Sequence, residues 1–265
     1  MQFSPATDAL PTSEPIEIRT LTADDLRAAL SEGYADFSEK RGDILFAGLL
    51  YPVIGLVTAI VTLGSPLLPL LFPLAAGLSL LGPLVSTGFY ELARRREAGL
   101  DSRWNHFLDV RKRPSFDGIL GLGVVLIVLF FVWVACAGLI YTAFFGTEVP
   151  PSLGSFLAQI FGTAEGWAMI VVGNLVGLGF AILVLAMSAI SLPMLVDRDI
   201  DMGTAIATSL RVFRRNRGVM LRWGAIVAAL LLIGSIPFFL GLAFVLPWLG
   251  YATWHLYTKS VERAR

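Results

Sequence analysis

Cysteine and histidine are nearly absent from the sequence, whose 265 residues include one cysteine and two histidines. Because a disulfide needs two cysteines and a zinc or iron–sulfur centre needs several thiolate or imidazole ligands, an internal disulfide and a thiolate metal cluster are excluded. We expect Cys136, which lies in an apolar run, to be a small packing residue. The Walker loop, GxSxG and HExxH motifs are absent too. We therefore expect no cofactor, no metal site and no enzymatic activity.

Charged residues are also scarce. They make up 15% of the chain and hydrophobic residues 56%, whereas globular proteins carry roughly 25% charged residues. The mean hydropathy is +0.75. This composition excludes an ordinary water-soluble globular domain, and the length suits one polytopic membrane domain.

Six apolar stretches, which contain a single charged residue, Arg222, predict an all-α bundle of transmembrane helices. About 20 apolar residues cross the ~30 Å hydrocarbon core of a bilayer as a helix. The predicted spans are residues 44–63, 67–90, 119–145, 166–196, 219–236 and 237–257. A single helix over 219–257 would be about 58 Å long, so we divide that stretch at its Ser-Ile-Pro sequence. Prolines in the second span predict kinks, and the carbonyls that they free must find partners in neighbouring helices.

All 20 basic residues fall on one side of this six-span arrangement. They lie in four segments: before residue 44, in 91–118, in 196–222 and after residue 257. The charged residues on the predicted far side are Glu148 and Glu165, and both are acidic. Because basic residues are enriched on the cytoplasmic side of membrane proteins, we expect three hairpins with both termini in the cytoplasm.

The parts of the chain outside the spans also carry structure signals. Residues 1–20 are expected to be a disordered tail, and 21–260 a single membrane domain. The amphipathic segment 21–40, with Thr22 as its N-cap, either lies flat on the membrane or docks on its own protein. A second amphipathic segment covers 201–214. We expect 102–113 to form a short helix that places Trp104 towards the membrane. On the far side, the apolar patch 153–161 is expected to dip into the interface.

Four stretches of sequence are similar to one known family. They are GFYELARRREAGLDSRWNHF (88–107), GTAEGWAMIVVGNLVG (162–177), SLPMLVDRD (191–199) and GSIPFFLGLAFVLPWLGYATWHLY (234–257). These motifs resemble an uncharacterised family of bacterial integral membrane proteins, the domain of unknown function 2189, over roughly residues 18–259. The resemblance implies a multi-pass protein of the bacterial inner membrane and implies no activity.

Some relatives in that family are labelled cytochrome c oxidase subunit I, which the histidine content tests. A haem–copper oxidase subunit holds its haem irons and copper with about six intramembrane histidines. This chain has two histidines, and His106 lies in a predicted cytoplasmic loop. We therefore reject the oxidase assignment.

One histidine and one asparagine in the predicted spans are candidates for an intramembrane role. His255 is either a ligand or proton acceptor at the membrane face, or part of an interfacial aromatic belt in which it hydrogen-bonds a carboxylate. Asn174 either hydrogen-bonds across helices or binds a ligand. Because the first four spans contain no charged residue, the sequence argues against ion-coupled transport.

The cytoplasmic face carries the remaining candidates, for which two interpretations stay open. The charges either set the topology and lock the loops together through salt bridges, or form a pocket for anionic lipid headgroups or an acidic partner. The candidate lipid- or partner-binding residues are Glu91, Arg94, Arg95, Arg96, Trp104, Asp197, Arg198, Arg214, Arg215 and Arg217.

Taken together, these patterns favour a non-enzymatic membrane scaffold that binds lipids or another membrane protein. The expected partners are membrane lipids with anionic headgroups, with another membrane protein as a further possibility and no nucleic acid. The second hypothesis is an uncoupled transporter or channel for a small neutral or amphipathic molecule. The sequence does not indicate an oligomeric state.

Overall fold

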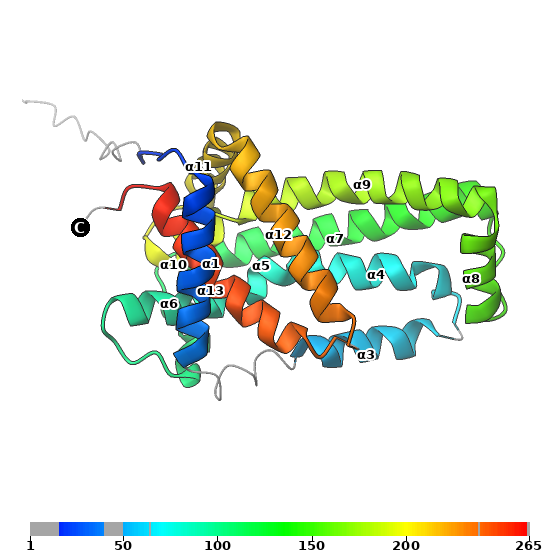
Figure 1. Ribbon diagram of the computed structural model, residues 1–265, viewed down its shortest axis with the longest axis horizontal. Helices are drawn as coiled ribbons and strands as arrows, with labels where there is room; N and C mark the ends of the chain where they lie inside the picture. The colour runs from blue at the N-terminus through cyan, green and yellow to red at the C-terminus, as the bar shows by residue number, and fades with distance from the viewer. Residues whose placement is uncertain (1–15, 40–49, 64, 238, 264–265) are drawn as a thin grey trace, which may run out of the picture.

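The computed structural model describes residues 16–39, 50–63, 65–237 and 239–263, and within them the regular structure is helical apart from one isolated β-bridge. The expected all-α class is therefore confirmed. Figure 1 shows the long helices running side by side along the longest axis of the molecule. One end of this bundle gathers the segments that the sequence places in the cytoplasm, and a short helix, α8, crosses the opposite end.

Three helical stretches of the described chain are long and apolar enough to cross a membrane. The first is α7 (Phe116–Phe145), the second is α9 (Ala164–Ser188) together with α10 (Ser191–Asp197), and the third is α12 (Arg217–Ser235). A bent stretch over 68–97 makes a fourth if it is one span. The helix α3 (Leu50–Thr62) covers the later part of the first predicted span, whose residues 44–49 lie outside the described ranges.

The bent stretch is the proline-rich second span. It is divided into short pieces with a bend of 43° between its two halves. The pieces are η1 (Leu68–Leu70), α4 (Leu71–Leu78), η2 (Ser79–Leu81), α5 (Gly82–Val85) and α6 (Thr87–Glu97). The indole of Trp133 on α7 donates to the Pro73 carbonyl at 2.9 Å, which links α4 to α7. A Cβ atom on Gly77 would lie 2.8 Å from the Phe130 ring, so a larger residue here would force the aromatic side chains of α7 to shift.

The outer surfaces of the long helices are apolar. Side chains such as Leu139 on α7 and Leu175 on α9 are more than 60% exposed. A surface of this kind is unfavourable in water and is what lipid requires. Further exposed apolar side chains on α3, α7, α9 and α12 include Ile60, Val124, Phe131, Leu178, Leu232 and Ile233.

The amphipathic helix α1 (Ala23–Glu39) docks on its own protein, across α13 (Leu242–Ser260). Its side chains Leu26, Ala29 and Phe37 are buried. At the crossing, a Cβ atom on Gly33 would lie 2.4 Å from the main-chain nitrogen of Ala252, so the two backbones approach as closely as glycine allows. Thr22 caps the helix as expected, since its hydroxyl accepts from the amide of Asp25 at 3.3 Å.

Residues 16–20, which the sequence assigns to a disordered tail, form an extended segment against the C-terminus. Ile18 and Val261 form an antiparallel bridge. The amide of Arg19 donates to the Ser260 carbonyl at 2.9 Å, and the amide of Glu262 donates to the Glu17 carbonyl at 3.0 Å. Residues 1–15 lie outside the described ranges.

The two ends of the bundle are built differently. At the far end the apolar patch forms the helix α8 (Leu153–Gly162), with a capping box between Ser152 and Ser155 and with Phe156 buried. At the other end, which the sequence assigns to the cytoplasm and which we call the cytoplasmic end, lie η3 (Trp104–Lys112) and α11 (Met202–Arg215), at the two predicted helical segments.

The last hairpin, α12 and α13, breaks at the predicted Ser-Ile-Pro sequence. A Cβ atom on Gly241 would lie 2.7 Å from the Gly234 carbonyl oxygen, so the turn is tight. In Figure 1 this turn lies beside α3 and stops short of the end that α8 covers.

Candidate functional site

The arginine run at the end of α6 reaches three different parts of the chain, and its first member stays on its own helix. The guanidinium of Arg94 binds the Glu91 carboxylate through two hydrogen bonds of 2.8 and 3.0 Å. The Glu91 side chain is only 2% exposed. A carboxylate that is removed from water needs a cation beside it. Arg94 supplies that cation to the buried Glu91 side chain.

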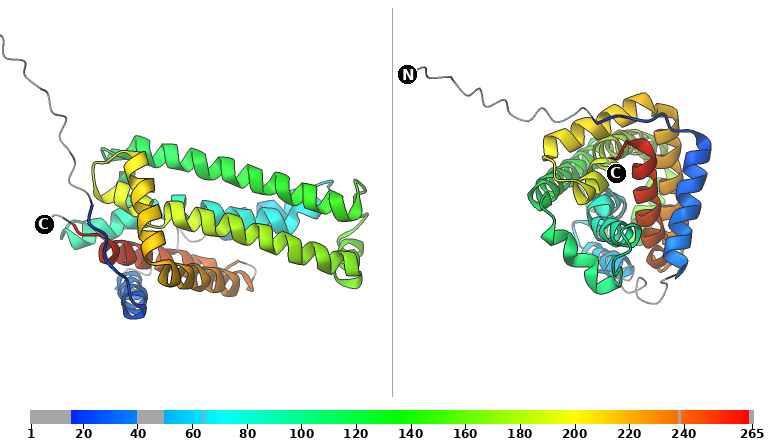
Figure 2. Two further views of the ribbon diagram at one scale, coloured as in Figure 1. Left: turned by 90° about the horizontal axis from the view of Figure 1, so that it is seen from above. Right: turned by 90° about the vertical axis from the view of Figure 1, so that its left-hand side faces the viewer.

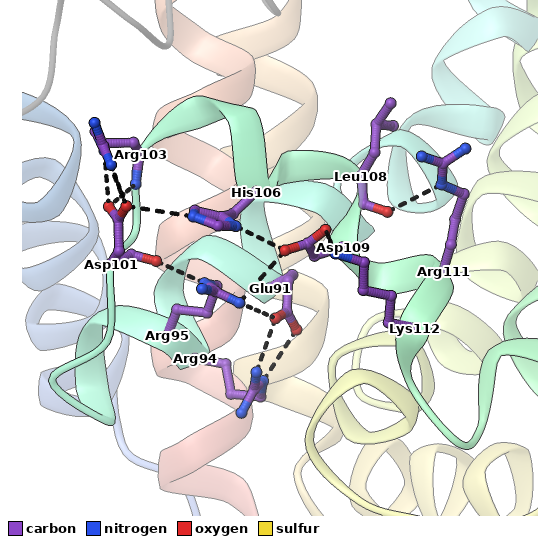
Figure 3. Close-up of polar contacts among 10 residues, drawn as sticks. All are labelled: Glu91, Arg94, Arg95, Asp101, Arg103, His106, Leu108, Asp109, Arg111 and Lys112. Atoms are coloured by element: carbon purple, nitrogen blue, oxygen red, sulfur yellow. Dashed lines mark hydrogen bonds and ion pairs between the residues drawn. The ribbon is translucent and has the colours of Figure 1, made fainter.

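The second arginine, Arg95, binds the loop that carries η3 (Figure 3). Its Nε donates to the main-chain oxygen of Asp101 at 2.6 Å, and its Nη1 lies 3.5 Å from the Asp109 carboxylate. The ring of His106 lies between the same two acidic residues, with Nδ1 2.7 Å from Asp109 and Nε2 3.3 Å from Asp101. Arg95 therefore holds this loop against α6, and His106 links two acidic residues within the loop.

The carboxylates of this loop are held in their charged form. Hydrogen bonds from Lys112 and His106 lower the pKa of Asp109 to about 2. Hydrogen bonds from the side chain and amide of Arg103 lower the pKa of Asp101 well below its ordinary value. At neutral pH both acids are ionised and bind their cations.

The third arginine, Arg96, binds α1. Its Nε lies 3.1 Å from the Asp36 carboxylate and its Nη2 lies 2.6 Å from the Glu39 carboxylate. Arg94 thus binds within α6, Arg95 links α6 to the η3 loop, and Arg96 links α6 to α1.

His255 of α13 lies between two carboxylates of α1. Its Nε2 is 2.8 Å from Asp36 and its Nδ1 is 3.2 Å from Glu32. Lys259, one turn further along α13, lies 2.9 Å from Glu32. This is the carboxylate-bonded arrangement that one of the two sequence interpretations expects, and it reinforces the crossing of α1 over α13.

Asp197, at the end of α10, is bound by the C-terminal part of the chain. The Tyr257 hydroxyl donates to it at 2.7 Å, and Arg263 donates two hydrogen bonds of 2.9 and 3.0 Å. Arg263 also binds Glu97 at 2.5 Å and lies over the Trp254 ring, 5.5 Å from its centre. Burial lowers the pKa of Arg263, but its hydrogen bonds to the two carboxylates outweigh burial and raise the pKa. Arg198 donates to the main-chain carbonyl of Glu262.

The arginines of α11 and α12 differ from those of α6. Arg214, Arg215 and Arg217 are exposed, and within the described ranges none of them forms an ion pair. Arg215 donates to the Thr20 hydroxyl at 3.3 Å. Arg222, further along α12, is exposed as well and has no acidic partner among the residues that the structure describes. We call Arg214, Arg215, Arg217 and Arg222 the arginine ridge.

The other sequence candidates lie outside this network. Asn174 is on the outer surface of α9, where its amide donates to the Ile170 carbonyl of the same helix at 2.8 Å. Trp104 is half exposed at the start of η3. Within the described ranges, no group of three or more histidine, cysteine, aspartate or glutamate residues is placed to hold a metal ion.

Sequence reasoning missed several residues of the site. Asn216, between α11 and α12, is buried, accepts from the Leu21 amide at 2.8 Å and donates to the Arg19 carbonyl at 3.1 Å. An asparagine at a helix junction is a capping signal, but this side chain does not cap α12 and holds residues 19–21 instead. Glu97 and Arg263 gave no signal, because their partners are distant in the sequence.

An apolar outer surface, helices of membrane-crossing length and charges gathered at one end define a helical integral membrane protein. Residues 71–197 match the model of a family described as predicted integral membrane protein (DUF2189). No curated protein and no solved structure matches the chain.

Proposed function

We propose that the protein is a non-enzymatic scaffold of the bacterial inner membrane, which binds anionic lipid headgroups with its cytoplasmic arginines. The observation that carries this proposal is the contrast between two groups of candidates. Arg94, Arg95 and Arg96 are bound to carboxylates of the protein, whereas the arginine ridge is exposed and makes no described ion pair. Exposed basic residues near a membrane surface attract anionic lipids by about 1 kcal/mol each.

The proposed layout places both termini in the cytoplasm. The one-sided distribution of basic residues supports an even number of crossings. The six crossings predicted from the sequence require α12 and α13 to reach the far face, whereas four crossings result if that hairpin enters the membrane and returns. In either layout the arginine ridge faces the cytoplasmic leaflet.

The alternative of an uncoupled transporter or channel has less support. Such a pathway needs polar groups that face the interior of the bundle. Asn174, the candidate for that role, is exposed on the outer surface and bonded to its own helix. Binding to another membrane protein through the same arginines is the remaining variant of the scaffold.

A lipid-binding experiment with nanodiscs tests the proposal. The purified protein in mild detergent is titrated with nanodiscs of phosphatidylglycerol and, separately, of phosphatidylcholine. We expect R214Q/R217Q to bind phosphatidylglycerol at least about tenfold more weakly, with little change for phosphatidylcholine. Arg215 is left in place because it also bonds Thr20.

The matched control is R19Q/R111Q, which removes the same charge from two other exposed positions and leaves the Lys112–Asp109 ion pair in place. If both variants lose the same affinity, net charge and not the arginine ridge accounts for the binding. Equal binding of both lipids by the unmodified protein contradicts the proposal directly.

A further inference from the structure

A groove lies between α1 and α12 on the side of the molecule where the arginine ridge begins. Its volume is about 410 Å³, within the range of ligand pockets, roughly 300–1,000 Å³. Figure 2 (right) shows the two helices side by side at the cytoplasmic end. The groove is lined by Ala23, Leu26, Arg27, Leu30, Arg222, Ala225 and Ile226.

The lining has two chemical parts. Leu26, Leu30, Ala225 and Ile226 make it apolar, and the only charged groups are two guanidiniums, one on each helix. Contact between water and the apolar lining of an open groove costs free energy. Its natural occupant in a membrane protein is a hydrocarbon chain, with an anionic group placed between the two arginines.

The two arginines are available to such a group. Arg222 is exposed and forms no ion pair with any acidic side chain that the structure describes. Arg27 binds Asp24 at 3.0 Å, but the two side chains are 81% and 87% exposed, and a pair this exposed is weak. Guanidinium groups bind phosphate oxygens through paired hydrogen bonds, so a phosphate is the anionic group that this pair of arginines favours.

The depth of the groove agrees with a lipid headgroup. Along α12, Arg217 and Arg222 are followed by no charged residue until Lys259, near the end of α13. Arg222 therefore marks the boundary between the charged end of the protein and its apolar part, which is the level of the phosphates in a bilayer.

We propose that the α1–α12 groove is a binding site for one anionic glycerophospholipid of the cytoplasmic leaflet. Its phosphate lies between Arg27 and Arg222, and an acyl chain lies along Leu30 and Ile226. This inference rests on the proposed function and makes it specific, because it assigns a single bound lipid to a defined site and not only a general attraction to the membrane surface.

Native mass spectrometry of the full-length protein from mild detergent tests this site. With phosphatidylglycerol added, we expect one retained lipid per chain, and R27Q/R222Q is expected to retain it about tenfold less well. The variant Ala225→Trp fills the groove and keeps both charges, so it is expected to lose the lipid as well. Inorganic phosphate in excess is expected to leave the lipid in place.

The outcomes separate this inference from the proposed function. If R27Q/R222Q and Ala225→Trp keep the lipid while R214Q/R217Q loses nanodisc binding, the groove inference is wrong and the proposed function stands. If neither pair of arginines affects binding, both are wrong. Displacement of the lipid by phosphate alone would overturn the assignment to a lipid. Since Arg27, Arg222 and Ala225 are exposed, the fold is expected to persist, which thermal unfolding checks.

Discussion

Single side chains at the cytoplasmic end illustrate what a sequence reveals and what it conceals. The run Arg94–Arg96 was readable as a cytoplasmic signal, because its meaning depends only on its position after an apolar stretch. Its partners were not readable. Glu91 lies one helical turn away, but Asp36 and Asp109 come from segments whose approach depends on the packing of the whole chain.

The acid response of the η3 loop is a prediction at this scale. Because the pKa of Asp109 falls from its ordinary value of 3.8 to about 2 on folding, its ionised form stabilises the loop above about pH 4. That contribution is lost as the pH falls from about 4 to about 2, when the folded protein must take up the proton. We expect pepsin to cut within residues 98–112 of the unmodified protein more readily at the lower pH. With cutting at each pH normalised to an unfolded substrate, Asp109→Asn should show a smaller difference between the two pH values than the unmodified protein, and an equal difference in both would contradict the explanation.

Among the helices, the crossing of α1 and α13 sets the geometry of the cytoplasmic end. The amphipathic pattern of 21–40 correctly predicted a helix and its buried face. It left open whether that face meets lipid or protein, since either is apolar. The glycine in the middle of that face was the available signal, because a helix presents glycine where another backbone comes close.

Replacement of this glycine tests the crossing. In Gly33→Ala the new Cβ atom would lie 2.4 Å from the Ala252 nitrogen, which is main chain and cannot turn away. We expect the two helices to separate and the unfolding free energy to fall by about 1–3 kcal/mol. Thermal unfolding in detergent measures this change. The matched control is Gly173→Ala in α9, where nothing lies within 4 Å and the substitution should be neutral or slightly stabilising. Equal melting of both variants would show that the crossing tolerates a methyl group.

For the whole molecule, the depth that the last hairpin reaches decides the number of membrane crossings. After Arg222, α12 has only residues 223–235 before its turn, about 20 Å of helix against a hydrocarbon core of ~30 Å. The turn carries no charge, and Ile236 within it is 74% exposed. The charge pattern alone could not settle this, because a hairpin that crosses and one that returns halfway leave the same basic residues in the cytoplasm.

Cysteine labelling is expected to find the hairpin turn inside the membrane. In a Cys136→Ser background, Ile236→Cys should resist a membrane-impermeant maleimide added from either side of the membrane. Ser152→Cys, on the exposed cap of α8, should react from the periplasm. Labelling of Ile236→Cys from the periplasm would contradict a turn at mid-depth and support six crossings.

The pairing of residues 16–20 with 260–262 has a consequence for how the protein is made. Residues 16–20 are synthesised before residues 260–262. Their backbone groups therefore lack these partners until the later segment has been made. Membrane insertion can therefore proceed helix by helix, while closure of this end of the bundle is delayed until residues 260–262 have been made. A chain that stops before residue 260 would leave the backbone of residues 17–19 without these partners.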